Sequence, residues 1–173
     1  MDKLEKQPCP MCGKNTLTLL QDDMDVPYFG KVFIMSMTCS SCNYRVADVE
    51  SAETKEPCKI EFEIDNEKDM KVRVVKSSEA TVKIPGMRMS MESGPGSDGF
   101  VSNIEGLLDK FKGIIEGERD TTDEDSVKKS CKNLLKKLWK VKLGDVKLKV
   151  VIEDPSGNSA IISDKAKISK LKK

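Results

Sequence analysis

Apolar residues at every second position predict half-buried β-strands in the second part of the chain. Within residues 58–64, and again within residues 146–152, every second side chain is apolar. A period of two places the apolar side chains on one face of a strand. The first strand offers Cys58, Ile60, Phe62 and Ile64 to a core, and the second offers Val146, Leu148, Val150 and Ile152.

The segment between these strands predicts further β-structure. Residues 65–69 are polar, so we expect a turn and a hairpin that brings residues 70–76 back beside residues 58–64. Residues 80–84 alternate again. Methionines continue this period at Met87, Met89 and Met91. They fit a core, with a flexible binding surface as the alternative.

A helical period replaces the β pattern between residues 101 and 143. Apolar residues recur three and four positions apart in two runs, which predicts two amphipathic helices joined by a short loop. The runs are Ile104, Leu107, Leu108, Phe111, Ile114 and Ile115, then Val127, Cys131, Leu134, Leu135 and Leu138. Candidate capping residues are Ser102, Glu105 and Gly117 for the first helix, and Thr121, Glu124 and Gly144 for the second.

Together these patterns predict a mainly β chain with one helical insertion. Two more strands are expected at residues 16–20 and 31–38, within a small unit at residues 1–50. The rest, residues 51–173, is expected to be a β-domain with the helical hairpin inserted at about residues 101–143. The strands on either side of the hairpin must pair to bury their apolar faces.

Four cysteines form two C-x-x-C pairs: Cys9 with Cys12, and Cys39 with Cys42. A two-residue gap lets both thiolates of a pair converge on one ion. Gly13 and Asn43 follow the pairs, and both residue types tolerate the positive φ that such a turn often needs. Two pairs supply a tetrahedron of thiolates, which suits zinc. The sequence therefore predicts a ribbon that binds one structural Zn²⁺, closed by a hairpin in the 26 residues between the pairs.

Disulfides are the alternative for these cysteines. The chain begins with charged residues instead of a secretory signal, and no stretch reaches the roughly 18–20 apolar residues of a membrane span. We therefore expect a cytoplasmic protein, in which paired cysteines more often bind metal. The other two cysteines, Cys58 and Cys131, fit buried, small apolar positions.

Composition argues against an enzyme and against a general attraction to nucleic acid. The chain has no histidine, so no Ser-His-Asp or Cys-His pair can form. Zinc with four thiolate ligands has no open position for a substrate. Because 30 basic residues balance 29 acidic ones, the net charge is only +1.

Charge is nevertheless uneven along the chain. Residues 116–125 contain six acids and one arginine, residues 128–149 contain nine lysines and one acid, and residues 165–173 contain five lysines. Solvated helix faces and a frayed C-terminus explain such runs. A charged docking surface for a protein partner is the alternative.

The segment at residues 154–159 reads Asp-Pro-Ser-Gly-Asn-Ser and ends the last long strand. Its residue types favour a tight turn. The functional alternative is a rigid, exposed loop that presents polar groups to a partner. Its contact residues would be Asp154, Ser156, Gly157, Asn158 and Ser159.

Five segments occur in a characteristic order: Cys9–Gly13, Ile34–Arg45, Val75–Pro85, Ile104–Leu108 and Asp154–Ser159. In this order they resemble the ZPR-type zinc-finger proteins, over roughly residues 7–162. Eukaryotic members carry two modules in tandem, whereas this chain has one, like the short archaeal relatives. Asn43 stands where the family usually has Gly.

The resemblance implies a zinc ribbon similar to that of translation initiation factor 2 subunits. A double-stranded β-helix, which is a squat β-sandwich, would follow it and carry the helical hairpin. It also implies a chaperone or adaptor that binds translation elongation factor 1-alpha. The alternative is a nucleic-acid-binding ribbon in translation or transcription, with contacts from Lys14, Lys31, Tyr44 and Arg45. The aromatic content of 5% argues against that alternative.

Overall fold

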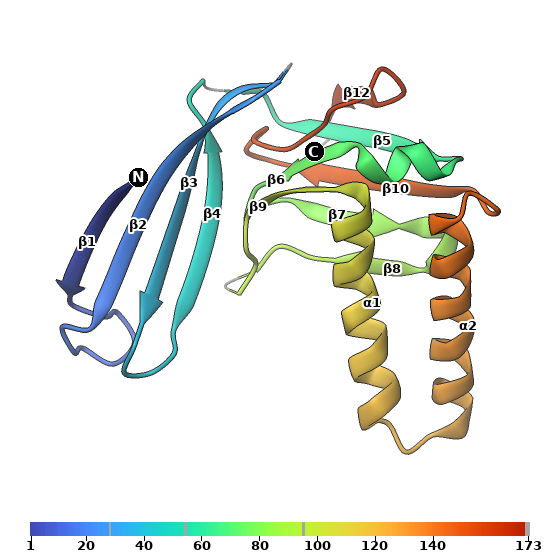
Figure 1. The fold of residues 1–173 in the computed structure, drawn as a ribbon, viewed down its shortest axis with the longest axis horizontal. Helices are drawn as coiled ribbons and strands as arrows, with labels where there is room; N and C mark the ends of the chain where they lie inside the picture. Colours follow the sequence, from blue (N-terminus) through green and yellow to red (C-terminus); the bar gives the residue numbers. More distant parts are fainter. Residues whose placement is uncertain (28, 54, 95, 172–173) are drawn as a thin grey trace.

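The computed structural model describes residues 1–27, 29–53, 55–94 and 96–171. Its first four strands form one antiparallel sheet in sequential order, which stands beside a β-sandwich (Figure 1). They are β1 (Asp2–Gln7), β2 (Leu17–Val26), β3 (Gly30–Cys39) and β4 (Arg45–Ser51). The two predicted strands of this unit are present but longer. β1 and β4 were not predicted, because their mixed sequences show no clear period.

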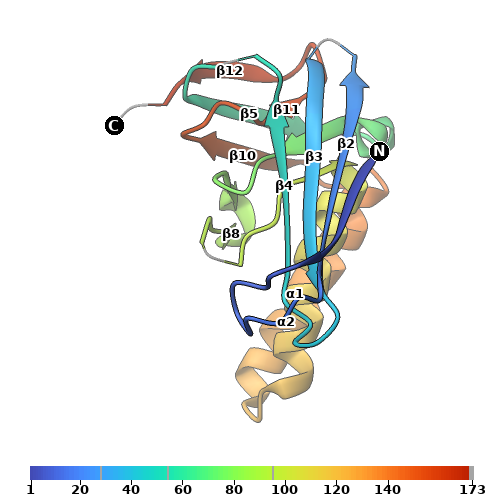
Figure 2. The same ribbon diagram turned by 90° about the vertical axis from the view of Figure 1, so that its left-hand side faces the viewer.

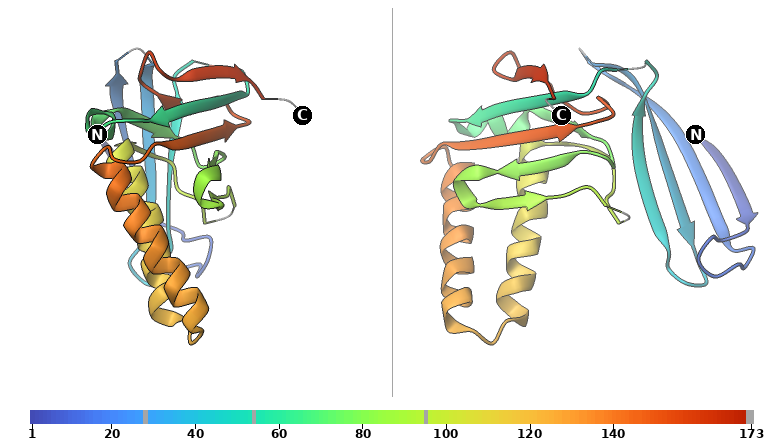
Figure 3. Two further views of the ribbon diagram at one scale, coloured as in Figure 1. Left: turned by 90° about the vertical axis from the view of Figure 1, so that its right-hand side faces the viewer. Right: turned by 180° about the vertical axis from the view of Figure 1, so that it is seen from behind.

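The remaining strands form two sheets that share one core (Figure 3). The five-stranded sheet has the order β12-β5-β10-β7-β8, and the three-stranded sheet has the order β11-β6-β9. Their bounds are β5 (Cys58–Ile64), β6 (Arg73–Lys76), β7 (Thr81–Ile84), β8 (Met89–Met91), β9 (Phe100–Asn103), β10 (Leu148–Asp154), β11 (Ala160–Ile161) and β12 (Lys167–Lys170). The mainly β fold with an inserted helical hairpin is therefore confirmed.

Pairing around β5 differs from the sequence prediction. β5 pairs with β10 from Ile64↔Leu148 to Cys58↔Asp154, so strands on both sides of the hairpin do pair. The predicted hairpin between residues 58–64 and 70–76 is wrong. A short 3-10 helix, η1 (Glu67–Lys71), carries the chain to the other sheet, where β6 pairs with β9 and β11. The Asn66 side chain caps η1 by accepting a hydrogen bond from the Asp69 amide.

The C-terminal segment is a paired strand and not the frayed end that its lysines suggested. β12 pairs with β5, with Ile168 opposite Ile60. Lys165 anchors the approach to β12, because its Nζ lies 2.6 Å from the buried Asp69 carboxylate and 2.9 Å from Asp65. Lys172 and Lys173 lie outside the described residues.

The methionine stripe contributes to the core, as predicted. Met87 is buried, and Met89 and Met91 are partly buried against the same apolar cluster. Cys131 is also buried and Cys58 half-buried in this core. The polarizable, unbranched methionine side chain fills the irregular space beside β7 and the helices.

Helices α1 (Ile104–Thr121) and α2 (Asp125–Lys142) form the predicted hairpin, which projects beyond the sandwich (Figures 1 and 3). The cap of α1 is Asn103, whose side chain accepts a hydrogen bond from the Gly106 amide; Ser102 was the wrong prediction. α1 also continues past Gly117, so Thr121 ends α1 instead of capping α2. Neither helix in the described part of the chain is long and apolar enough to cross a membrane.

Candidate metal centre and the 154–159 loop

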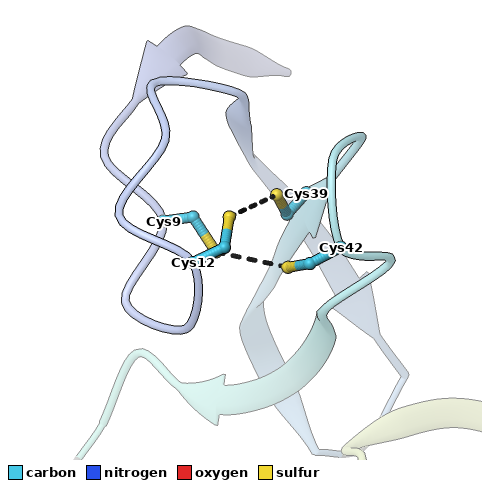
Figure 4. Close-up of side chains that lie close together, drawn as sticks. All are labelled: Cys9, Cys12, Cys39 and Cys42. Atoms are coloured by element: carbon cyan, nitrogen blue, oxygen red, sulfur yellow. Dashed lines mark hydrogen bonds between the residues drawn. The ribbon is translucent and has the colours of Figure 1, made fainter.

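The four paired cysteines meet at one end of the ribbon sheet. Cys9 and Cys12 lie in the turn between β1 and β2, and Cys39 and Cys42 lie in the turn between β3 and β4. Because β2 pairs with β3 and Leu17 faces Cys39, both turns lie at the same end (Figure 2). Side chains from the two turns therefore point toward each other (Figure 4).

Each turn has the backbone geometry that the sequence predicted. The Gly13 amide donates to the Cys9 carbonyl at 2.9 Å, and the Asn43 amide donates to the Cys39 carbonyl at 3.0 Å. Gly13 has φ +69° and Asn43 has φ +58°, both in the left-handed region. Asparagine thus takes the place of glycine here with little cost, since it tolerates this region better than most residues.

The sulfur positions fit one tetrahedral zinc ion. All four Sγ atoms lie within 4.8 Å of one another; Cys9 to Cys42 measures 3.7 Å and Cys12 to Cys39 measures 3.8 Å. A tetrahedron with Zn–S bonds of about 2.3 Å has edges of about 3.8 Å, which matches both distances. Cys9 and Cys39 are buried, so the ligands are held on a rigid base.

The electrostatics of the cluster also favour a cation. The Thr16 hydroxyl lies 3.3 Å from Sγ of Cys39 and lowers the pKa of Cys39 to about 6. The Tyr44 amide acts to lower the pKa of Cys42, but desolvation beside the cluster and the three neighbouring sulfurs outweigh it and raise this pKa to about 12. Four sulfurs this close become thiolates together only when a divalent ion supplies opposite charge.

Zinc held by these residues would be a structural cross-link. Four protein ligands complete its coordination, so its contribution is to hold the two turns of the ribbon together. The apolar base of the centre is small, comprising Leu17 with the partly buried Leu19, Met37 and Tyr44. Metal ligation compensates for this small core.

Residues proposed for a nucleic-acid ribbon are not gathered by the fold. Lys14 and Arg45 lie at the metal end, whereas Lys31 lies at the start of β3, the opposite end from Cys39. Lys31 is paired with Asp23 at 2.9 Å. Tyr44 packs on the cysteine cluster. The four residues therefore do not form one surface.

The 154–159 loop is an internal contact instead of an exposed one. Asp154 has 0% exposure and Ser159 has 3%, contrary to the expected exposed loop. The Asp154 carboxylate accepts hydrogen bonds from the hydroxyls of Ser77 at 2.9 Å, Ser159 at 2.5 Å and Ser156 at 2.7 Å. Short polar residues at the end of β10 thus form hydrogen bonds with one another and with Ser77, which follows β6. Their local sequence could not show these contacts.

This loop also joins the sandwich to the ribbon. Gly157 has φ +72°, and a Cβ there would lie 2.4 Å from the Glu56 carbonyl oxygen, so only glycine allows the approach. Three polar contacts of 2.6–3.2 Å connect β4 to the sandwich: Asp48 with Ser78, Ala47 with Asp98, and Ser51 with Asn158. A small apolar cluster around Val49, Val75 and Ala160 lies beside them. These contacts set the orientation of the ribbon.

A buried lysine in this junction was missed by the sequence analysis. Lys76 is fully buried, and its Nζ donates to the Ser77 carbonyl at 2.9 Å, the Ser97 hydroxyl at 3.1 Å and the Asp98 carbonyl at 3.2 Å. Burial lowers its pKa, while the nearby Asp154 opposes that shift. Lysine is rarely buried, so composition and periodicity gave no reason to place Lys76 in the interior. The one feature that could have drawn attention to Lys76 is its position inside one of the five family segments.

Taken together, the chain is a four-cysteine zinc ribbon followed by a β-sandwich with a helical hairpin. Residues 3–57 match the family model of the ZPR1 zinc-finger domain, and residues 68–172 match that of the ZPR1 jelly-roll domain. The chain therefore belongs to the ZPR1 family, in a single-module form, as the resemblance implied.

Relatives from archaea and eukaryotes match nearly the whole chain. A ZPR1-like protein of Pyrococcus horikoshii is 40% identical over 169 residues, covering 95% of this chain and 76% of the relative. One from Methanocaldococcus jannaschii is 36% identical over 165 residues, covering 95% and 83%. The zinc finger chaperone zpr1 of Schizosaccharomyces pombe is 32% identical over 157 residues, covering 88% of this chain but 33% of that longer protein.

Proposed function

We propose that this chain is a protein-binding module that acts as a chaperone or adaptor for translation elongation factor 1-alpha. One observation carries the proposal: the ribbon and the jelly roll together match the fission yeast relative named a zinc finger chaperone. The closed four-cysteine centre supports a binding role, because zinc of this kind shapes a surface and leaves no position for substrate.

The outer face of the ribbon sheet offers a surface for an unfolded client. A groove of about 240 Å³ lies on this face, with Leu4, Leu19, Met35 and Met37 in its lining. Leu4, Leu19 and Met37 face one another across three strands, and Leu4 is 59% exposed. Flexible methionines beside the exposed Leu4 and the partly buried Leu19 can adapt to different apolar segments, as a chaperone surface requires.

The edge of this sheet adds a second means of contact. Among the strands that the structure describes, β1 is outermost in this sheet and pairs only with β2. An extended client segment can pair with such an edge through backbone hydrogen bonds while its side chains enter the groove. This mode recognises a partly folded chain with little dependence on its sequence, which suits a chaperone.

The test is direct binding between the zinc-loaded, reduced protein and elongation factor 1-alpha from the same cells, measured by isothermal titration calorimetry. We expect a complex that persists at high salt, because apolar contact is not screened. Leu4→Asp should weaken it about tenfold or more, as loss of a central apolar anchor does.

The matched control is Ile168→Asp, which introduces the same charge at a 70% exposed position on β12. It should leave the affinity unchanged. If the unmodified protein does not bind the factor in any nucleotide state, the proposed client is wrong. If Leu4→Asp and the control bind equally well, the client stands and the proposed surface is wrong.

A further inference from the structure

Helix α2 carries four lysines spaced four residues apart: Lys128, Lys132, Lys136 and Lys140. We call these four residues the lysine row. Residues four apart lie on the same helix face, about 6 Å apart along the axis. Trp139 lies on this face beside the row and is 60% exposed. Because each step of four residues also turns about 40° around the axis, the row is inclined along the helix, next to a large, accessible aromatic ring.

No internal contact explains the lysine row. Among the described residues, none of its four members takes part in an ion pair. Other lysines of α2 do have partners: Lys142 lies 2.6 Å from Asp109, and Lys137 donates to the Gly86 carbonyl at 2.6 Å. Like charges four residues apart destabilise a helix. Apart from Lys140, which lies in the last turn where a positive charge is favourable, the row therefore works against the helix.

Trp139 is equally unexplained by the fold. It is the single tryptophan of the chain, yet the core face of α2 is formed by Cys131, Leu138 and Val141. α2 lies on the side of the molecule away from the ribbon, and no other element of the described chain covers its outer side (Figures 1 and 3). A helix lying on a membrane would need a free apolar face, and here that face is used by the core.

We propose that the lysine row and Trp139 bind single-stranded RNA. The phosphate backbone is a regular line of negative charge that complements a regular line of lysines. A base can stack on the exposed indole, which is how proteins without base-specific contacts hold single strands. Unpaired bases are offered mainly by RNA loops and ends, whereas the bases of a duplex are already stacked.

An acidic protein surface fits this face less well. Charges on a protein surface have no fixed linear period, and tight protein interfaces centre on side chains buried in pockets. Five cavities of about 240–580 Å³ in the described residues include neither Trp139 nor any lysine of the row. The RNA surface is independent of the elongation-factor proposal, because it uses α2 and leaves the ribbon groove free.

The probe is a uridine oligonucleotide of about 12 nucleotides, a typical length for one single-strand site. Binding is followed by the fluorescence anisotropy of the oligonucleotide and by quenching of Trp139 emission. Trp139 is the single tryptophan of the chain, so no other tryptophan contributes to this signal. With four phosphates neutralised, log Kobs should fall against log salt with a slope of about −2.8 between about 0.05 and 0.2 M. Circular dichroism checks that each variant remains folded.

The variants separate charge from stacking. Lys132→Gln with Lys136→Gln should halve the slope to about −1.4. Trp139→Ala should weaken binding about tenfold and leave the slope unchanged. Lys14→Gln with Arg45→Gln removes the same charge from the metal end of the ribbon and should change neither quantity.

Three results would overturn the proposal. The first is no saturable binding at the lowest salt. The second is binding lost in the ribbon variant but kept in the α2 variants. The third is a polyglutamate peptide of equal charge that quenches Trp139 more tightly than the oligonucleotide, which would assign the face to an acidic protein.

Discussion

Replacing Asp154 with Ala should strongly destabilise the protein. The change removes the acceptor for the buried hydroxyls of Ser77 and Ser159 and for the Ser156 hydroxyl and amide. Each buried hydroxyl left without a partner costs about 1–3 kcal/mol, whereas Ser156 is half-buried and can turn to water. Lys76 also loses a nearby opposite charge. We expect a loss of about 3–5 kcal/mol in the free energy of unfolding.

The measurements are urea unfolding and thermal unfolding of the zinc-loaded, reduced protein, both followed by far-ultraviolet circular dichroism. A loss of this size lowers Tm by about 6–20 °C in a chain of this length. A double-mutant cycle localises the effect: Ser77→Ala should cost less in the Asp154→Ala protein than in the unmodified one, since the two residues share one hydrogen bond.

Asp123→Ala is the control, because Asp123 is exposed at the tip of the helical hairpin. It should change stability by less than about 0.5 kcal/mol. The hydrogen bonds of Asp154 do not stabilise the fold if Asp154→Ala costs less than about 1 kcal/mol, or if its effect simply adds to that of Ser77→Ala. Either result would mean that water replaces the carboxylate without penalty.

Three other changes test separate parts of the structure. Cys39→Ser should abolish stoichiometric zinc binding measured by mass spectrometry, and a full zinc content would contradict the ligand assignment. Deleting residues 165–173 should lower Tm by about 5 °C or more, because β12 and the Lys165–Asp69 pair are lost; an unchanged Tm would show that the tail adds no stability. Burial, with Asp154 nearby, raises the pKa of Cys58 from 9.0 to about 11. Stability should therefore fall between pH 9 and 11, where the unfolded thiol ionises first, and iodoacetamide should label Cys58 slowly at pH 9, so rapid labelling would refute the shift.

Local patterns predicted most elements and the metal ligands. Each of three patterns belongs to a single element, and the structure contains all three elements. The patterns are the alternation at residues 58–64 and the helical periods at residues 104–115 and 127–138. The metal ligands could be predicted because a C-x-x-C pair is recognised from a two-residue gap followed by a residue that accepts positive φ. Caps were predicted less well, since Asn103 and Ser102 are neighbours with similar capping chemistry and only the helix start distinguishes them.

The amino-acid sequence alone specifies local features of this protein: strand and helix periods, turn residues and the spacing of the zinc ligands. Pairing between distant segments is visible only in the folded chain. β5 pairs with β10 and β12 instead of with β6, the next strand in the sequence. Asp154 is buried because Ser77, far away in the chain, donates a hydrogen bond to its carboxylate. A polar residue is exposed or buried according to the hydrogen bonds that distant residues offer it, and no local pattern carries that information.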